Sequence, residues 1–183
     1  VTAFLIAFVL APYVIRKLQA IKLGQQARDD GPKRHLAKSG TPTMGGILII
    51  FSVTLSTLLW ADISRPIIWL VLAATLGFFA IGFADDYLKF VKAQSKGLSA
   101  GQKFTAQVGV ALAIALTLYF LPGYSTKLSV PFFKNFMPDL GWFYVAFAVL
   151  VIVGSSNAVN LTDGLDGLAV GPVMIAALAY TVV

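Results

Sequence analysis

The sequence predicts an all-α integral membrane protein, a polytopic helix bundle with about six transmembrane helices visible. Hydrophobic residues make up 58% of the 183 positions and charged residues only 12%, which lies outside the range of soluble domains. The apolar residues form unbroken runs, whereas a transmembrane β-barrel would show alternating segments of about ten residues. Because backbone groups in hydrocarbon must be hydrogen-bonded within their own segment, we expect these runs to be helices.

Six apolar segments follow one another along the chain, and the sixth is partial. They are expected at residues 1–15, 44–61, 66–84, 104–122, 142–158 and 168–183. The chain opens on Val1 inside an apolar run and stops at Val183 inside another, although a spanning helix needs about 20 apolar residues. We therefore expect residues 1–183 to form a single transmembrane domain that is the N-terminal part of a longer protein.

The basic residues indicate the orientation of the helices. Of the fourteen Lys and Arg residues, seven lie in residues 16–43 and four in residues 86–103, and the other three are Arg65, Lys127 and Lys134. The positive-inside rule places the two rich connections in the cytoplasm. The connection at residues 123–142 then lies outside, and its prolines, aromatic residues and lysines suit the level of the lipid headgroups.

The acidic residues gather on the same predicted side of the membrane as the basic ones. The chain has no Glu, and by simple alternation the connection near residues 157–167 is cytoplasmic too. Six of the eight Asp then fall on the cytoplasmic side: Asp29, Asp30, Asp85, Asp86, Asp163 and Asp166. Both signs of charge at close range suit a phosphorylated substrate with a divalent cation, because carboxylates hold the cation and Lys or Arg hold the phosphates.

The first segment of interest is "KSGTPTMGGILII" at residues 38–50. Its glycines and proline form a tight lead into a helix, and Thr41 or Thr43 is available as the N-cap. A helix start of this kind favours an anion, because it exposes N–H groups and the positive end of the dipole. The alternative is an ordinary loop-to-helix cap with Lys38 as a positive-inside charge.

The second segment, "IGFADDYLKF" at residues 81–90, places two adjacent carboxylates at the end of an apolar run. One interpretation is a helix that stops at the water interface with Asp85 and Asp86 as its polar end. Against it, the carboxyl end of a helix disfavours negative charge. Adjacent helical residues also point about 100° apart, so both carboxylates face one ligand only if the helix ends or bends there. We favour a functional pair.

The third segment is "NAVNLTDGLDGLAVG" at residues 157–171. Asn157, Asn160, Asp163 and Asp166 recur every three residues and would follow one polar face of a helix. Two successive Asp-Gly turns are the alternative, which explains the glycines but leaves the asparagines unexplained. Because polar clusters in or beside a membrane usually mark a pathway or a site, we favour a site.

Together, "SGTPTMGG", "FADDYLKF" and "NAVNLTDGLDGLA" closely resemble the phospho-N-acetylmuramoyl-pentapeptide transferase (MraY) family of the polyprenyl-phosphate N-acetylhexosamine-1-phosphate transferase superfamily. The resemblance implies transfer of phospho-MurNAc-pentapeptide from its UDP carrier to undecaprenyl phosphate, which yields lipid I and UMP for peptidoglycan synthesis. It implies a ten-helix fold, a requirement for Mg²⁺, and a site on the cytoplasmic face of the bacterial inner membrane. We expect the lipid bilayer as a partner and no nucleic acid, and the sequence leaves open whether the protein forms a homo-oligomer.

The resemblance also implies roles for residues of this chain. Asp85 and Asp86 match the paired catalytic aspartates, with Asp85 as the favoured general base and Asp86 beside Mg²⁺ or the lipid head, although a covalent nucleophile is an alternative. Asn160 matches a polar residue beside the metal and the diphosphate. Four positions match the substrate-binding nucleoside side of the pocket: Lys38, Thr43, Asp163 and Asp166. Lys89 and Lys103 are lesser candidates for holding the diphosphate.

Two family motifs are absent from these residues: a loop that supplies a metal-binding Asp, and a His-rich loop. We expect both beyond residue 183, and we expect this stretch alone to be inactive. One rival is a sister transferase that uses UDP-GlcNAc and would share the paired aspartates. A more distant rival is part of a cation-coupled transporter, although transporter sites tend to lie near the bilayer midplane.

Overall fold

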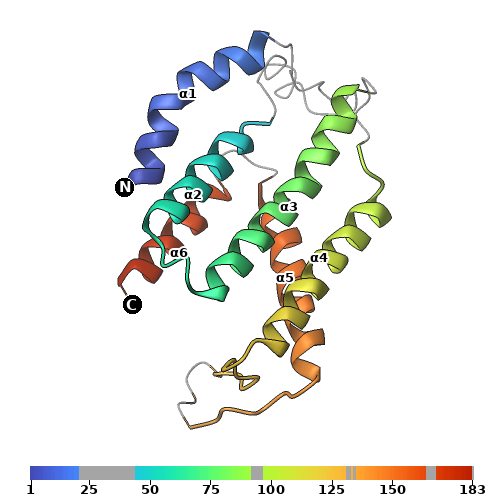
Figure 1. The fold of residues 1–183 in the computed structure, drawn as a ribbon. Helices are drawn as coiled ribbons and strands as arrows, with labels where there is room; N and C mark the ends of the chain where they lie inside the picture. Colours follow the sequence, from blue (N-terminus) through green and yellow to red (C-terminus); the bar gives the residue numbers. More distant parts are fainter. Residues whose placement is uncertain (21–43, 92–96, 131–132, 134, 164–167, 183) are drawn as a thin grey trace. The chain divides into compact units, whose positions relative to one another are not determined.

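The computed structural model describes residues 1–20, 44–91, 97–130, 133, 135–163 and 168–182, and all regular secondary structure within these ranges is helical. The helices are α1 (Thr2–Ala20), α2 (Gly46–Trp60), α3 (Pro66–Val91), α4 (Ala100–Phe120), α5 (Phe143–Thr162) and α6 (Val170–Val182) (Figure 1). An isolated β-bridge joins Lys127 and Asp139. The all-α prediction is confirmed, and each of the six expected segments corresponds to one helix.

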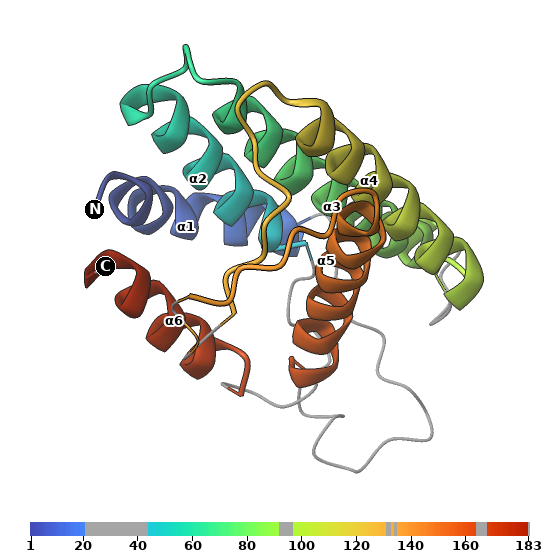
Figure 2. The ribbon, with the colours of Figure 1, turned by 90° about the horizontal axis from the view of Figure 1, so that it is seen from below.

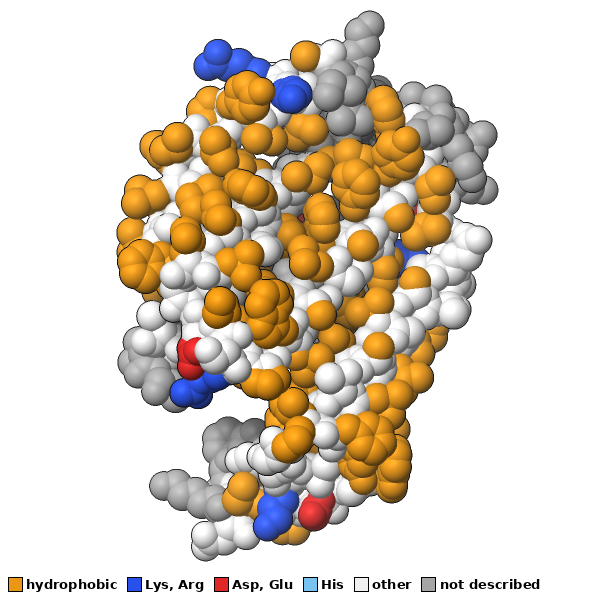
Figure 3. All heavy atoms as spheres, in the orientation of Figure 1, with side chains coloured by type: hydrophobic (Ala, Val, Ile, Leu, Met, Phe, Trp, Pro, Cys, Tyr) orange, Lys and Arg blue, Asp and Glu red, His pale blue; other side chains and the backbone are white. Residues whose placement is uncertain are grey.

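Four of the described helices are long and apolar enough to cross a membrane: α1, α3 over Pro66–Phe90, α4 and α5. Helices α2 and α6 are apolar but shorter. Many large hydrophobic side chains on these helices are exposed, and Figure 3 shows hydrophobic side chains over most of the visible face of the helices. Such surfaces are stable in lipid because hydrocarbon solvates them. The prediction of a multi-pass membrane protein is therefore confirmed.

The helices extend beyond the apolar runs from which they were predicted. Helix α3 continues to Val91, past the expected end at residue 84, so the paired aspartates lie inside it and do not terminate it. Helix α4 begins at Ala100 instead of residue 104, and α5 continues through Asn157 and Asn160 to Thr162. Hydropathy locates the part of a helix that suits hydrocarbon, whereas a helix ends where its backbone hydrogen bonds end.

The chain forms two compact units, and the first contains residues 1–110. Helix α2 packs against both α1 and α3, and it lies between them in Figures 1 and 2. Gly77 of α3 faces Val110 of α4 so closely that a Cβ at residue 77 would lie 2.8 Å from the Val110 side chain. This close approach ties the first half of α4 to α3.

The second unit contains residues 111–183. Its apolar core joins Ala115 of α4 to Val145 and Ala148 of α5. The Tyr119 and Trp142 rings stack with their centroids 4.5 Å apart, at the ends of these two helices. Small residues at the contact allow α4 and α5 to approach closely, which is typical of helix pairs in membranes.

The connection between α4 and α5 is closed by its own hydrogen bonds. The Leu128 N–H donates to the Pro138 carbonyl at 2.9 Å, and the Leu140 N–H donates to the Thr126 carbonyl at 3.2 Å. The Thr126 hydroxyl also donates to the Asp139 carboxylate. These contacts hold the connection as a hairpin-like turn, and its location at the headgroups stays a prediction.

Candidate active site

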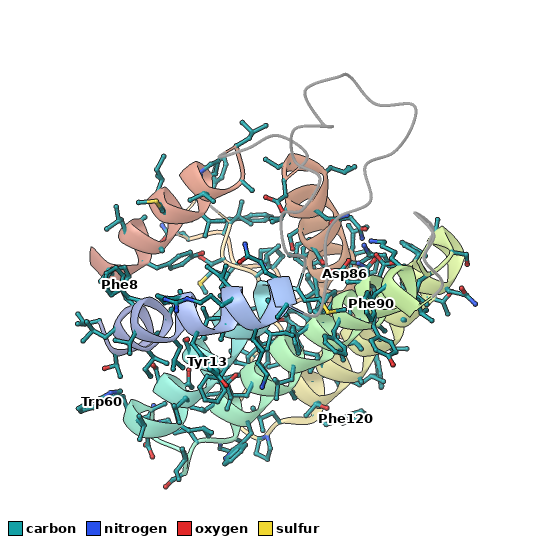
Figure 4. All side chains as sticks on the ribbon, turned by 90° about the horizontal axis from the view of Figure 1, so that it is seen from above. Phe8, Tyr13, Trp60, Asp86, Phe90 and Phe120 are labelled. Atoms are coloured by element: carbon teal, nitrogen blue, oxygen red, sulfur yellow. The ribbon has the colours of Figure 1, made fainter. Side chains whose placement is uncertain are left out.

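Asp85 and Asp86 share one cation in the last turns of α3. The Lys89 ammonium lies 2.7 Å from Oδ2 of Asp85 and 3.2 Å from Oδ1 of Asp86. Residues three and four positions apart lie on the same side of a helix, so Lys89 reaches both acids although they point about 100° apart. The helix therefore neither ends nor bends to bring the carboxylates to one partner. Figure 4 labels Asp86 and, one turn later, Phe90 near this end of α3.

Asp85 has further partners from the segment that leads into α4. The Leu98 backbone N–H donates to Oδ1 of Asp85 at 2.8 Å, and the Lys103 ammonium lies 4.0 Å from Oδ2. Both oxygens of this carboxylate therefore face positive or donor groups. A carboxylate in a membrane protein is costly unless it is paired, and these contacts supply the pairing.

The start of α4 is held by a capping box in the sequence "SAGQ" at residues 99–102. The Ser99 hydroxyl accepts a hydrogen bond from the Gln102 N–H at 3.2 Å, and the Gln102 side-chain oxygen accepts one from the Ser99 N–H at 3.0 Å. This reciprocal pair satisfies two backbone donors that a helix start leaves open. It also sets the positions of Leu98 before the cap and Lys103 in the first turn.

Asp86 differs from Asp85 in its exposure. The side chain of Asp86 is 41% exposed and that of Asp85 is 12% exposed. Within the described residues, Lys89 is the polar partner of Asp86. Asp86 is therefore the acid of the pair that is open to a ligand, and Asp85 is the acid that organises the two lysines.

The described residues contain no group of three or more His, Cys, Asp or Glu side chains that could hold a metal ion. A Mg²⁺ ion nevertheless needs only one or two protein ligands when it also binds substrate phosphates and water. The half-exposed carboxylate of Asp86 is a hard oxygen donor of the right kind. The donor set of this cluster therefore fits a Mg²⁺ ion held mainly by its substrate.

The asparagine and aspartate cluster belongs to the second unit. Asn157 donates from its side chain to the Val153 carbonyl of the same helix at 2.8 Å. Asn160 is exposed in the last turn of α5, and Asp163 is the exposed C-cap. The polar face therefore continues only to the end of α5, because the helix ends at Thr162. Asp166 lies outside the described residues.

The basic and threonine candidates of the first motif, Lys38 and Thr43, also lie outside the described residues. The expectation that Thr41 or Thr43 caps the second helix is wrong, because the N-cap of α2 is Gly45. Because Gly45 has no side chain, α2 has no side-chain cap at this position. The Gly45 backbone is already in the helical region, with φ −58° and ψ −23°. Helix α2 thus begins at Gly46, next to its apolar run, and not directly after one of the threonines.

The sequence indicates Lys89 and Lys103 only as lesser candidates, and it does not predict the Leu98 N–H or the close approach of Gly97 to Asp85. The Ser-x-x-Gln capping box was a readable signal for the start of α4, and Lys89 stands at the helical spacing from both acids. The Leu98 contact had no such signal, because every residue except proline carries a backbone N–H.

Comparison with known proteins adds two matches to family models. The model described as glycosyl transferase family 4 matches residues 68–183, which contain Asp85, Asp86, Asn160, Asp163 and Asp166. The model described as phospho-N-acetylmuramoyl-pentapeptide-transferase signature 1 matches residues 38–50, which contain Lys38 and Thr43. All of the site residues expected from the sequence thus fall within one match or the other.

The chain is also similar to curated proteins named phospho-N-acetylmuramoyl-pentapeptide-transferase. It is 52% identical to the one from Syntrophus aciditrophicus and 56% identical to the one from Desulfotalea psychrophila, in each case over 98% of this chain and 50% of the relative. The relative from Desulforapulum autotrophicum is 55% identical over 99% of this chain and 50% of its own length. The chain thus spans about half the length of these relatives.

Proposed function

This chain belongs to glycosyl transferase family 4, and from that premise we propose that the protein transfers phospho-MurNAc-pentapeptide from UDP-MurNAc-pentapeptide to undecaprenyl phosphate. The products would be lipid I and UMP, within peptidoglycan synthesis. The observation that carries the proposal is the identity of 52–56% to proteins with the transferase name, together with the signature match at residues 38–50.

The cluster around Asp85 supports this chemistry by its charge. Phosphoryl transfer depends mainly on positioning and on neutralisation of charge, because the attacking phosphate of the lipid is already anionic. Lys89 and Lys103 are cations that Asp85 holds near one point. We assign them to the phosphates of the two substrates. Asp85, which orients them, remains the proposed general base toward the lipid phosphate, and Asp86 is proposed to lie beside Mg²⁺ or the lipid head.

Mg²⁺ is the proposed cofactor, and its contribution when bound would be to neutralise the diphosphate of the donor. Asp86 has an open carboxylate for this ion, and Asn160 has an exposed side-chain carbonyl of the same hard type. A further Asp ligand is expected beyond residue 183. We further propose that Lys38, Thr43, Asp163 and Asp166 bind the nucleotide side of the donor.

The proposed location is the bacterial inner membrane, with the site on the cytoplasmic face. The distribution of basic residues supports this orientation, since the Lys89 and Lys103 connection is one of the two rich ones. Such a site meets both substrates, because the nucleotide sugar is in the cytoplasm and the phosphate of the lipid lies at the membrane surface. An exposed apolar helix surface is consistent with a lipid acceptor.

The test uses full-length protein in membranes with undecaprenyl phosphate and UDP-MurNAc-pentapeptide radiolabelled in the sugar. We expect labelled lipid and release of one UMP for each lipid formed. Labelled lipid from UDP-GlcNAc, with none from UDP-MurNAc-pentapeptide, would replace the proposal with the sister activity. Solute uptake without any labelled lipid would overturn the transferase assignment altogether.

A further inference from the structure

Residues 97–103, here called the clamp segment, approach α3 very closely at Asp85. A methyl group at Gly97 would lie 2.3 Å from Oδ1 of Asp85 and 2.5 Å from the Asp85 backbone carbonyl oxygen. The carboxylate could rotate away from such a group, but the carbonyl oxygen is held by the helix. Gly97 does not have a positive φ, so space is the reason for a glycine at this position.

The close approach of Gly97 places the next backbone N–H on the carboxylate. Leu98 donates to Oδ1 of Asp85 at 2.8 Å across thirteen residues of sequence. The capping box of Ser99 and Gln102 begins immediately afterwards and fixes the backbone on the other side of Leu98. A donor that lies between this close approach and a fixed helix cap has little freedom to follow a carboxylate that turns.

We propose that the clamp segment is a positioning element for the transfer reaction: Gly97 admits the segment, and the Leu98 N–H fixes the rotation of the Asp85 carboxylate. This inference rests on the function proposed above. With Oδ1 held by Leu98, Oδ2 is directed to Lys89 at 2.7 Å and to Lys103 at 4.0 Å. Gly97 and Leu98 touch no reacting atom and act through Asp85.

The physical reason is that the terminal torsion of an Asp side chain is soft. Rotation about the Cβ–Cγ bond is broad and roughly two-fold, so one ion pair alone does not fix the plane of the carboxylate. Lys89 and Lys103 have long, flexible side chains, so the positions of their ammonium groups change when the carboxylate that binds them rotates. Phosphoryl transfer is sensitive to that position, because a displacement of about 1 Å can cost about 100-fold in rate.

The experiment replaces Gly97 with alanine in the full-length enzyme. We expect Gly97→Ala to lower kcat by about 10-fold to 100-fold while the KM for UDP-MurNAc-pentapeptide stays within about twofold, because Asp85 and not the nucleotide pocket is disturbed. Gly82→Ala and Gly109→Ala are matched controls, since a methyl group at either position meets no atom within 4 Å. Wild-type kcat in Gly97→Ala would overturn the proposal.

Hydrogen exchange at the Leu98 amide gives a second measurement that does not depend on activity or on folding of the Gly97 variant. We expect slow exchange in the wild-type enzyme and at least about 10-fold faster exchange in Asp85→Ala, where the acceptor is gone. Unchanged exchange in Asp85→Ala would overturn the clamp. The two proposals fail in different ways. If exchange behaves as expected but wild-type protein makes no labelled lipid, the proposed function is wrong. The contact between Leu98 and Asp85 is then confirmed, but it has no role in this transfer reaction.

Discussion

The Lys89 ammonium lies 2.7 Å from Oδ2 of Asp85, one helical turn earlier on α3. The same nitrogen lies 3.2 Å from Oδ1 of Asp86, so one cation serves two adjacent acids. A basic residue in the last turn of a helix also interacts favourably with the helix dipole, whereas the acids alone would not. This arrangement explains how α3 continues through a doubled negative charge to Val91.

Replacement of Asp85 by asparagine should remove nearly all turnover. The amide can still accept the Leu98 hydrogen bond, but it carries no charge for Lys89 and Lys103. We expect a loss of at least about 100-fold in kcat, with binding of the nucleotide substrate largely retained. Lipid product and nucleotide binding should be measured side by side. The control is Asp62→Asn, which removes an exposed ion pair with Arg65 and keeps an oxygen for the Ser64 N–H. Near-wild-type turnover in Asp85→Asn would refute the assigned role.

Asp86, the more exposed acid of the pair, should determine how activity depends on the Mg²⁺ concentration. We expect Asp86→Asn to raise the Mg²⁺ concentration for half-maximal activity by about 10-fold or more, because Asp86 is the carboxylate open to a ligand. The measurement is a Mg²⁺ titration of lipid formation after removal of metal with a chelator. Asp62→Asn should titrate like the wild type. An unchanged titration of Asp86→Asn would assign the metal to other residues.

The two lysines should differ in importance. Lys89 contacts both acids at 2.7 Å and 3.2 Å, whereas the acid that Lys103 approaches among the described residues is Asp85, at 4.0 Å. We therefore expect Lys89→Met to reduce kcat about 10-fold more than Lys103→Met. Lys89→Met should also lower the thermal stability, since two adjacent carboxylates lose their shared cation. Lys127→Met serves as the control, and equal losses in the two site variants would contradict this ranking.

Loss of the capping box should loosen the start of α4. Ser99→Ala removes the hydroxyl that accepts from the Gln102 N–H, and an N-cap of this kind is worth about 1 kcal/mol. We expect the Gln102 amide to exchange about 5-fold faster, with a smaller fall in kcat than in Gly97→Ala. Ser155→Ala is the matched control, because that hydroxyl donates to backbone carbonyls of its own helix, at Val151 and Ile152. Unchanged exchange at Gln102 would show that the cap is not needed.

The hairpin-like connection between α4 and α5 should weaken in acid. The Thr126 hydroxyl and then the Gly141 N–H hold the pKa of Asp139 below its usual value. Since the folded-state pKa is lowered, the stabilisation is present above the ordinary pKa of Asp, about 4, and is lost as pH falls through the lowered value. Hydrogen exchange at Leu128 and Leu140 should therefore differ between wild type and Asp139→Asn at neutral pH and converge in strong acid. Identical exchange at neutral pH would contradict the prediction.

The number of helices and their approximate places could be predicted from hydropathy. Each described helix contains one apolar run, because hydrocarbon leaves a spanning backbone no partner except itself. The ends of the helices could not be predicted in the same way. Asp85 and Asp86 read as the end of α3, yet Lys89 compensates their charge and the helix continues. The N-cap of α2 likewise lies at Gly45 and not at a threonine.

The candidate site residues were proposed from motifs at Lys38 and Thr43, at Asp85 and Asp86, and from Asn160 to Asp166, and all of these positions lie inside the two family matches. Their roles stay predictions. Types and spacings of side chains carry that information in the chain itself. The different exposure of the two aspartates could not be predicted, because they are adjacent residues of the same type in one motif. Their exposed fractions, 12% and 41%, depend on the helix face that α4 and its preceding segment cover.

The linear chain thus accounts for a helical membrane protein with paired acids beside basic residues, because hydrophobicity and charge belong to individual residues. The hydrogen bond from the Leu98 N–H to Asp85 depends on tertiary packing, because the segment before α4 must lie against the end of α3. A backbone donor has no signature in the sequence, and its direction depends on how two helices meet. The need for glycine at residue 97 arises in the same way, because a methyl group there would lie 2.5 Å from the Asp85 backbone carbonyl oxygen, which the helix holds in place.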